Sequence, residues 1–147
     1  MQVNEIISLL KTEFGKDILF TKEISPSRGL VRIDPERIVA VAEFLFIRHG
    51  FRFIIASGFD SKEGLEIMYH FMLDESHFIL NVNVVLPRED PWIDSITPLI
   101  KGANWIEREI LEILGIQFRN HPQPEPLLSG ENWEKGYYPY RRENKDV

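Results

Sequence analysis

Two neighbouring runs of alternating residues constrain the fold of this chain more than any other feature of its 147 residues. Between residues 65 and 73, and again between residues 78 and 86, apolar side chains recur at every second position. A period of two places successive side chains on opposite faces of a β-strand. Residues 74–77 form a polar break between the two runs. The pattern therefore predicts two antiparallel strands joined as a hairpin, with one apolar face.

Shorter apolar runs predict three more strands. Residues 18–24 and 29–33 flank a Ser-Pro-Ser turn, and Phe51, Phe53 and Ile55 alternate with their neighbours. Aromatic and β-branched residues favour strands, whereas serine and proline favour turns. Together with the hairpin, these runs predict a mostly antiparallel sheet that is covered on one face only.

Three segments have the apolar spacing and the end signals of helices. The first covers residues 4–15, with Asn4 at the N-cap, and the second covers residues 34–50, with Asp34 at the N-cap. The third begins between residues 97 and 103 and runs to a glycine at position 115. Asparagine and aspartate accept hydrogen bonds from the free N–H groups at a helix start, and glycine commonly follows a helix end. The apolar stripes of these helices can cover the sheet, which predicts an α+β fold with helices packed on one face.

The composition excludes several classes of protein. The chain has no cysteine, which excludes disulfides, thiolate nucleophiles and cysteine-ligated iron–sulfur clusters. Its formal net charge of -6 argues against binding to nucleic acid, which needs a dominant basic face. No apolar run approaches the about 20 residues of a membrane span, and charged residues interrupt the N-terminal segment that a signal peptide would keep apolar. We therefore expect a protein of the cytosol, with the length of a single domain.

The chain changes character after residue 118. Residues 119–147 contain several prolines and glycines, which disfavour regular structure, yet they also contain Trp133 and a group of tyrosines. Disordered tails are poor in aromatic residues. We therefore predict an α+β domain over residues 1–118. An irregular C-terminal extension over residues 119–147 is expected to lie on that domain or on a partner.

One segment carries a longer signature. Ala103-Asn104-Trp105-Ile106-Glu107-Arg108-Glu109 is followed by Gly115-Ile116-Gln117-Phe118 and by His121-Pro122. This arrangement resembles the signature of one hydrophilic subunit of NADH–quinone oxidoreductase (respiratory complex I), the subunit designated C. Looser matches continue through Trp133 to Pro139-Tyr140-Arg141-Arg142, and the resemblance covers about residues 34–143.

Several positions depart from the pattern of that family. Glu112 stands where members usually have aspartate, and Gln123-Pro124-Glu125-Pro126 replaces a basic run. The chain is also short for a respiratory member of the family. In these respects it is more similar to the corresponding subunits of energy-converting, membrane-bound NiFe-hydrogenases, which are relatives of complex I. A hydrogenase-type complex is therefore the favoured host, and respiratory complex I is the alternative.

The resemblance implies a structural and assembly subunit with no cofactor and no catalytic site of its own. Subunits of this family lie in the hydrophilic arm of the complex, beside a large catalytic subunit and a small iron–sulfur subunit. The NiFe centre or the quinone site, and the iron–sulfur clusters, are expected on those partners. The arm is expected at the cytoplasmic face of the membrane, with ion translocation in a separate membrane arm, so this chain would contact the membrane only indirectly.

The resemblance also indicates which residues belong to the motif or to a partner interface. They are Trp105, Glu107, Arg108, Glu109, Glu112, Gly115, Phe118, His121, Pro122, Trp133, Tyr137, Tyr138, Arg141 and Arg142. The charged residues of the helix form either a solvated face with an Arg108–Glu112 pair or ion pairs at an interface. Trp105 is predicted to lie in the core. The aromatic residues of the tail pack either in the core or in pockets of a partner.

Two other functions are the alternatives. A stand-alone enzyme could use Glu107, Glu109 and His121 as acid and base groups. However, His121 is followed by proline, so we expect its ring to bind backbone groups in a rigid turn rather than a metal ion. A binding module for a peptide or a small molecule could instead use a free edge of the sheet.

Overall fold

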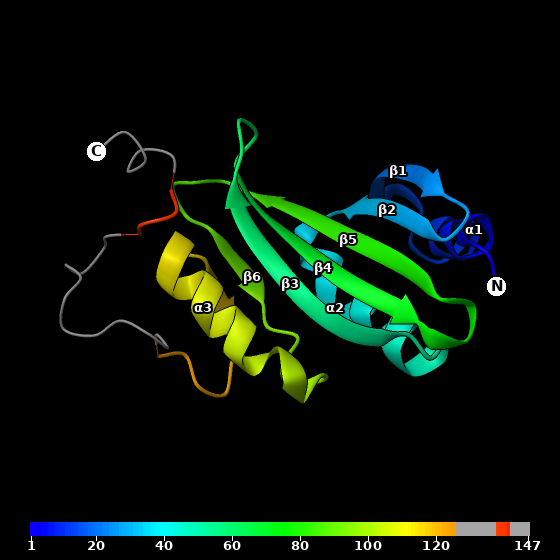
Figure 1. The fold of residues 1–147 in the computed structure, drawn as a ribbon. Helices are drawn as coiled ribbons and strands as arrows, with labels where there is room; N and C mark the ends of the chain where they lie inside the picture. Colours follow the sequence, from blue (N-terminus) through cyan, green and yellow to red (C-terminus); the bar gives the residue numbers. More distant parts are fainter. Residues whose placement is uncertain (126–137, 142–147) are drawn as a thin grey trace.

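The computed structural model describes residues 1–125 and 138–141 of the chain. Its centre is a five-stranded sheet with the strand order β1-β2-β5-β4-β3. The strands are β1 (Ile18–Ser25), β2 (Arg28–Ile33), β3 (Arg52–Asp60), β4 (Leu65–Leu73) and β5 (Phe78–Leu86). Neighbouring strands are antiparallel except β2 and β5, which are parallel. The predicted α+β fold with a mostly antiparallel sheet is confirmed (Figure 1).

The β4–β5 hairpin has the register that its alternating sequence predicts. Its pairing runs without a shift from Leu73 opposite Phe78 to Leu65 opposite Leu86. A short turn, Asp74–Ser76, lies between the strands, at the polar break. Most of the alternating apolar side chains of both strands are buried in the core, as expected for a sheet with one covered face.

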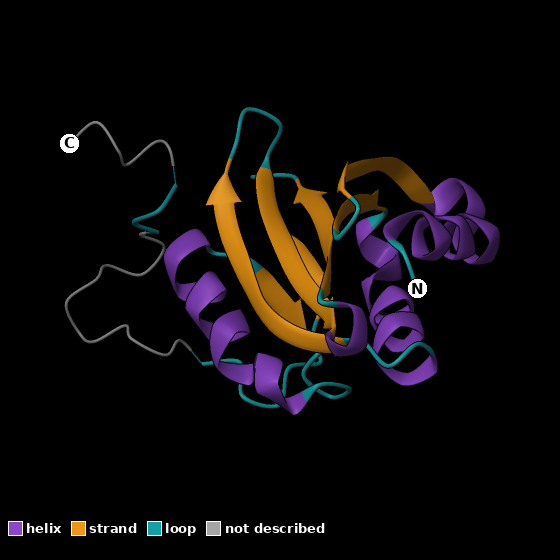
Figure 2. Cartoon of the chain, turned by 45° about the vertical axis from the view of Figure 1, so that its right-hand side comes forward, coloured by secondary structure: helices purple, strands orange, loops and turns teal. Residues whose placement is uncertain are grey.

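Three α-helices of the described residues pack against the apolar face of the sheet. They are α1 (Val3–Phe14), α2 (Ile38–Glu43) and α3 (Asn104–Leu114). A Cβ atom at Gly29 of β2 would collide with side chains of α1, and one at Gly58 of β3 would collide with side chains of α3. These glycines therefore permit close approach of a helix at each end of the sheet. Figure 1 shows α1 beside the β1–β2 hairpin and α3 beside β3, and Figure 2 shows the curved sheet between the helices.

The N-terminal helix begins earlier than the sequence predicts. Gln2, rather than Asn4, occupies the N-cap position of α1, and its side chain makes no capping hydrogen bond. At the other end, Gly15 follows the helix with φ 53° and donates its N–H to Lys11 O. The stop at Gly15 is therefore as predicted, and only the start is wrong.

The helix predicted over residues 34–50 is divided into three parts. Asp34 caps a 3-10 turn (Pro35–Arg37), and its carboxylate accepts a hydrogen bond from Glu36 N at 3.0 Å. α2 follows, and residues Phe44–Arg48 then form a π-helical turn. The predicted N-cap is therefore correct. The subdivision lies beyond a prediction from apolar spacing, because three or five residues are too few to reveal the different period of a 3-10 or π turn.

Two short strands form a second sheet that the sequence does not reveal. β6 (Trp92–Asp94) and β7 (Gln117–Arg119) pair in parallel, and α3 lies between them in the chain. Three residues are too few to show an alternation period, so the sequence predicts only a connector where β6 lies. β7 also continues through the predicted boundary between residues 118 and 119. The pairing brings the segment after β6 next to α3.

The face of the sheet opposite the helices carries a polar network. Arg32 of β2 donates from Nε to Asn83 Oδ1 of β5 at 2.6 Å. Its guanidinium also forms ion pairs with Glu63 (2.7 Å) and Glu66 (3.4 Å). Asn83 in turn donates to the Glu66 carboxylate at 3.0 Å. The network confirms the polar face that the alternation predicts.

Candidate interface around helix α3

A buried carboxylate connects α3 to the segment that follows β6. Glu107 is 1% exposed and accepts three hydrogen bonds. Ser95 Oγ and Thr97 Oγ1 donate to its Oε1 at 2.5 and 2.6 Å, and Ile96 N donates to its Oε2 at 2.9 Å. Ser95 Oγ also accepts a hydrogen bond from Thr97 N at 3.0 Å. The first turn of α3 is thereby fixed to residues 95–97.

Burial and hydrogen bonding have opposite effects on the pKa of Glu107. Burial raises the pKa because it disfavours the charged carboxylate, and this effect is the largest. The hydrogen bonds from Ser95, Thr97 and Ile96 oppose this effect and lower the pKa. The net result is a pKa above the usual value of 4.5.

His121 lies next to Glu107 and binds backbone groups. Its Nδ1 accepts a hydrogen bond from Gln123 N at 2.9 Å, which assigns the ring proton to Nε2. Nε2 then donates to the Asn104 carbonyl at 3.2 Å and lies 3.6 Å from Glu107 Oε1. The imidazole thus binds backbone groups in a turn, as its neighbouring proline predicts.

Tyr69 of β4 places a second titratable group near this cluster. Its side chain is fully buried, and within the described residues its hydroxyl has no hydrogen-bond partner. Burial raises the pKa of Tyr69 well above 10.0, and the charge of Glu107 raises it further. Tyr69 therefore stays a neutral phenol and forms part of the core beneath α3.

The space around Glu107 and His121 is too small for a substrate. A cavity of about 20 Å³ lies between them, with Phe118 and Pro124 among its lining residues. This volume corresponds to about one water molecule, whereas pockets for small molecules have volumes of roughly 300–1,000 Å³. In the part of the chain that the structure describes, no group of three His, Asp or Glu side chains is arranged to hold a metal ion.

Residues of the tail cap the C-terminal end of α3. Gly115 adopts the left-handed conformation (φ 79°), as predicted, and donates to Leu111 O at 2.8 Å. Tyr140 N donates to Ile113 O at 3.0 Å, and Arg141 Nε donates to Leu114 O at 2.7 Å. The last carbonyl groups of a helix need such partners, and a positive charge at this end also complements the helix dipole.

The ring of Tyr138 completes this cap. A Cβ atom at Gly115 would lie 2.5 Å from Tyr138 Cε2, so glycine is needed for the ring to approach the backbone. The guanidinium of Arg141 lies over the Tyr138 ring, 5.0 Å from its centre. Residues 138–141 of the extension therefore pack on the chain's own domain.

The start of α3 presents a large aromatic side chain to the solvent. Trp105 is 67% exposed, so the prediction that it lies in the core is wrong. Beside it, Arg108 Nε donates to Glu125 O at 2.9 Å, and Asn104 Nδ2 donates to Gln123 Oε1 at 3.0 Å. The segment up to residue 125 is thus held along α3, next to the exposed indole.

The interpretation of the charged residues of α3 as a solvated face is also wrong. Glu107 and Glu112 are buried, with 1% and 3% exposure, whereas Arg108 and Glu109 are half-buried. The physical reason is that two layers cover the helix. The sheet covers one side, and the segments 95–97 and 121–123 cover another. Ser95-Ile96-Thr97 was the available signal, because clustered hydroxyl groups can serve a buried carboxylate.

The remaining motif residues have different surroundings. Phe118 is buried in β7, and Pro122 is exposed. Trp133, Tyr137 and Arg142 lie outside the described residues.

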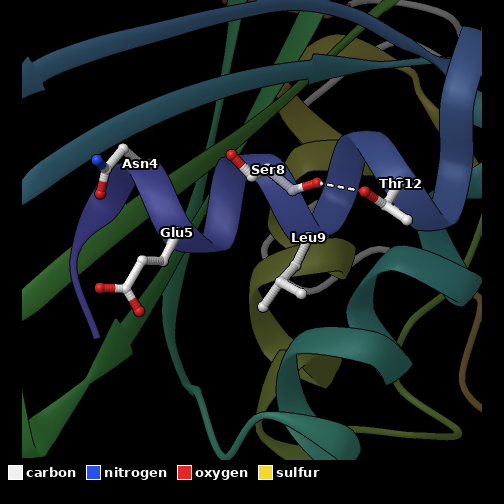
Figure 3. Close-up of a pocket in the computed structure, with 5 residues that line it drawn as sticks. All are labelled: Asn4, Glu5, Ser8, Leu9 and Thr12. Carbon is white, nitrogen blue, oxygen red and sulfur yellow. Dashed lines mark hydrogen bonds between the residues drawn. The ribbon is translucent and has the colours of Figure 1, made fainter.

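A hollow on α1 offers no comparable chemistry. Its lining residues all come from one side of this single helix, and all are exposed (Figure 3): Asn4, Glu5, Ser8, Leu9 and Thr12. The hydrogen bond in Figure 3 runs from Thr12 Oγ1 to Ser8 O, 3.0 Å, within the helix. In the part of the chain that the structure describes, no second element brings a charged or nucleophilic group to this hollow, so the convergent groups of a binding site are lacking there.

Comparison with known proteins gives a consistent family match. The sequence model of the respiratory-chain NADH dehydrogenase, 30 kDa subunit, matches residues 31–145. In F(420)H(2) dehydrogenase of Methanosarcina mazei, the subunit designated C is 32% identical over 146 residues, which are 97% of this chain and 92% of the relative. In NADH-quinone oxidoreductase of Roseiflexus sp., the subunit with the same letter is 34% identical over 110 residues, which are 71% of this chain and 63% of the relative.

Solved structures share the fold. A chain of the membrane-bound sulfane sulfur reductase, an archaeal respiratory membrane complex, aligns with a TM-score of 0.82 and 19% identity over 95% of this chain and 84% of that one. The trypsin-resistant fragment of Nqo5 aligns with a TM-score of 0.68 and 22% identity over 80% of this chain and 98% of that one. None of the helices in the described residues has both the length and the apolar character needed to cross a membrane.

Proposed function

Since the chain belongs to the family of the 30 kDa subunit of respiratory-chain NADH dehydrogenase and is a subunit of a complex I-like oxidoreductase, we propose that it is a non-catalytic scaffold of that complex. In this role it holds a large catalytic subunit and a small iron–sulfur subunit in register. The redox centres would lie on those partners, and the arm would lie at the cytoplasmic face of the membrane.

The hydrogen bonding of Glu107 carries this proposal. The candidate acid and base groups are Glu107, Glu109 and His121. Glu107 and His121 bind groups of their own chain, and Glu109 is half-buried on α3. A general acid or base must instead lie within hydrogen-bond distance of a substrate, in a cleft that admits it. The cavity beside the two residues holds about one water molecule. This arrangement supports a structural role for the motif.

Three kinds of host fit the chain. The divergent run at residues 123–126 favours an energy-converting NiFe-hydrogenase. The 32% identity to the F(420)H(2) dehydrogenase subunit, over nearly the full length of both chains, favours a host of that type. A respiratory NADH–quinone oxidoreductase is the third candidate.

Purification of the complex through a tag on this chain tests the scaffold role. Gentle detergent extraction from the native host should recover a large catalytic subunit and an iron–sulfur subunit in equal amounts with the tagged chain. The purified complex should show redox activity, whereas the isolated chain should show none. Recovery of the chain only as a free monomer, or turnover by the isolated chain, would contradict the proposal.

Metal analysis of the same complex separates the hosts. Nickel in a 1:1 ratio to the tagged chain would identify a hydrogenase. A complex without nickel that oxidises a reduced deazaflavin or NADH would identify one of the other hosts. Either result leaves the scaffold role intact.

A further inference from the structure

A groove with an apolar floor and an acidic rim lies between the end of β5, the start of β6 and the turn at residues 34–36. Its volume is about 220 Å³. Its apolar lining residues include Leu86 and Ile93, which are buried, and Val85, which is half-buried. Asp34, Glu36 and Asp90 line its edge, and Trp92, 36% exposed, lies beside them.

The carboxylates of the rim leave the groove with an excess of negative charge. In residues 1–125 and 138–141, none of Asp34, Glu36 and Asp90 forms a salt bridge. The basic residues next to lining residues already have acidic partners: Arg37 pairs with Asp17 at 3.3 Å, Arg88 with Asp60 at 2.6 Å, and Arg119 with Asp94 at 2.6 Å. A cation that enters the groove would therefore meet carboxylates that form no salt bridge within the described residues, one of which, Glu36, also attracts Arg119.

An arginine of the chain itself already stacks on Trp92, the aromatic residue that lines the groove. The guanidinium of Arg119 lies 4.1 Å from the centre of the Trp92 ring, which is cation–π distance. The hydrogen bond to Asp94 raises the pKa of Arg119 most, and the negative charge of Glu36 raises it further. An arginine of the chain itself thus combines aromatic stacking with acidic neighbours at one end of the groove.

We propose that the groove binds an arginine side chain from a partner subunit of the complex. The apolar stem of the arginine would lie on Val85, Leu86 and Ile93, and its guanidinium would lie among the rim carboxylates. A volume of about 220 Å³ suits one long side chain better than a drug-sized molecule, whose pockets have volumes of roughly 300–1,000 Å³. Arginine is also among the residues that dominate binding at interfaces.

This inference depends on the proposed scaffold role, and the first test uses cross-linking within the complex. The photoreactive residue p-benzoylphenylalanine replaces Pro87, which is exposed and lines the groove. Irradiation of the purified complex should link position 87 to a segment of another subunit that contains arginine. A link to this chain's own tail, a link to a segment without arginine, or the absence of any link would overturn the proposal.

Two double variants that each remove two negative charges give the second test. Glu36→Gln with Asp90→Asn removes two rim charges while leaving Asp34, which caps a turn, in place. The matched control, Glu23→Gln with Glu75→Gln, removes the same charge from exposed positions away from the groove. We expect about tenfold less partner subunit per tagged chain for the groove variant, and wild-type recovery for the control.

The outcomes distinguish the two proposals. If the wild-type chain recovers its partners and the groove variant recovers them equally well, the groove proposal fails and the scaffold role stands. If the wild-type chain recovers no partners, the scaffold role itself fails, and the groove proposal fails with it. Equal losses in the groove variant and in the control would show a general charge effect, which also overturns the groove proposal.

Discussion

At the scale of single residues, Glu107 shows how a charged side chain can belong to the core. It accepts three hydrogen bonds from residues 95–97, so replacement by alanine would leave two hydroxyl groups and one N–H group buried without a partner. An unsatisfied buried polar group costs about 1–3 kcal/mol. We expect Glu107→Ala to lower the free energy of unfolding by about 3 kcal/mol or more, measured by urea denaturation. A loss below about 1 kcal/mol would contradict this expectation.

Glu107→Gln is the matched variant. The difference in stability between this variant and the wild type should depend on pH. The amide oxygen can accept from Ile96 N, and the NH₂ group can donate to the hydroxyls of Ser95 and Thr97. Because the pKa of Glu107 is raised on folding, its favourable contribution is fully present below the unfolded-state pKa and is lost as the pH rises through the folded-state pKa. Urea denaturation at a series of pH values should show the glutamine variant gaining stability relative to the wild type as the pH rises above the usual glutamate pKa of 4.5. A constant difference across this range would show that Glu107 titrates alike in both states.

Tyr69 provides a second test at this scale. Its hydroxyl is fully buried, and its protein surroundings within the described residues offer no hydrogen-bond partner. Removal of a buried polar group without a partner is close to neutral or stabilising. We expect Tyr69→Phe either to lower the free energy of unfolding by less than about 0.5 kcal/mol or to raise it. A loss of more than about 1 kcal/mol in thermal or urea denaturation would reveal a hydrogen bond of this hydroxyl.

At the scale of elements, the C-terminal end of α3 depends on residues far along the chain. Gly115→Ala would place a Cβ atom against the Tyr138 ring and would strain a left-handed residue. We expect a loss of about 1–3 kcal/mol in the free energy of unfolding. Gly102→Ala is the control, since a Cβ atom there meets nothing within 4 Å. Equal effects of the two substitutions would argue against the cap formed by Tyr138 and Arg141.

Elements with a local pattern could be predicted from the sequence, and those that depend on distant partners could not. The β4–β5 hairpin and the glycine stop of α3 follow from neighbouring residues. The parallel pairing of β2 with β5 and the short pair β6–β7 depend on contacts between residues far apart in the chain, which no local period encodes.

The candidate site shows the same division. The place of His121 in a backbone-bound turn follows from its neighbouring proline. The burial of Glu107 and the exposure of Trp105 do not follow from their neighbours, because each contradicts the average preference of its residue type. The tertiary layers on either side of α3 decide both.

At the scale of the whole molecule, the extension serves the domain as well as any partner. Deletion of residues 127–147 should leave the α+β domain folded but block assembly. The deletion also removes the cap on α3, so the domain should be less stable. Loss of the contacts from Tyr138, Tyr140 and Arg141 should lower the free energy of unfolding by about 2–3 kcal/mol, measured by urea denaturation of the truncated chain. Complete unfolding of the truncated chain would show that the extension is an essential part of the core. Normal recovery of partner subunits by the truncated chain would instead show that the extension is not part of the interface.

The parallel contact between β2 and β5 has a consequence for synthesis on the ribosome. The segment up to Ile33 emerges first, yet β2 pairs with residues Ile79 to Asn83 in β5, about fifty positions later. Helix α1 and the first hairpin can cover each other, but the edge of β2 that pairs with β5 must stay open until β5 has been translated. Contacts of such long sequence separation slow folding. The unpaired edge of β2 in the nascent chain is consequently open to pairing with other chains, although it lies inside the sheet once β5 has paired with it.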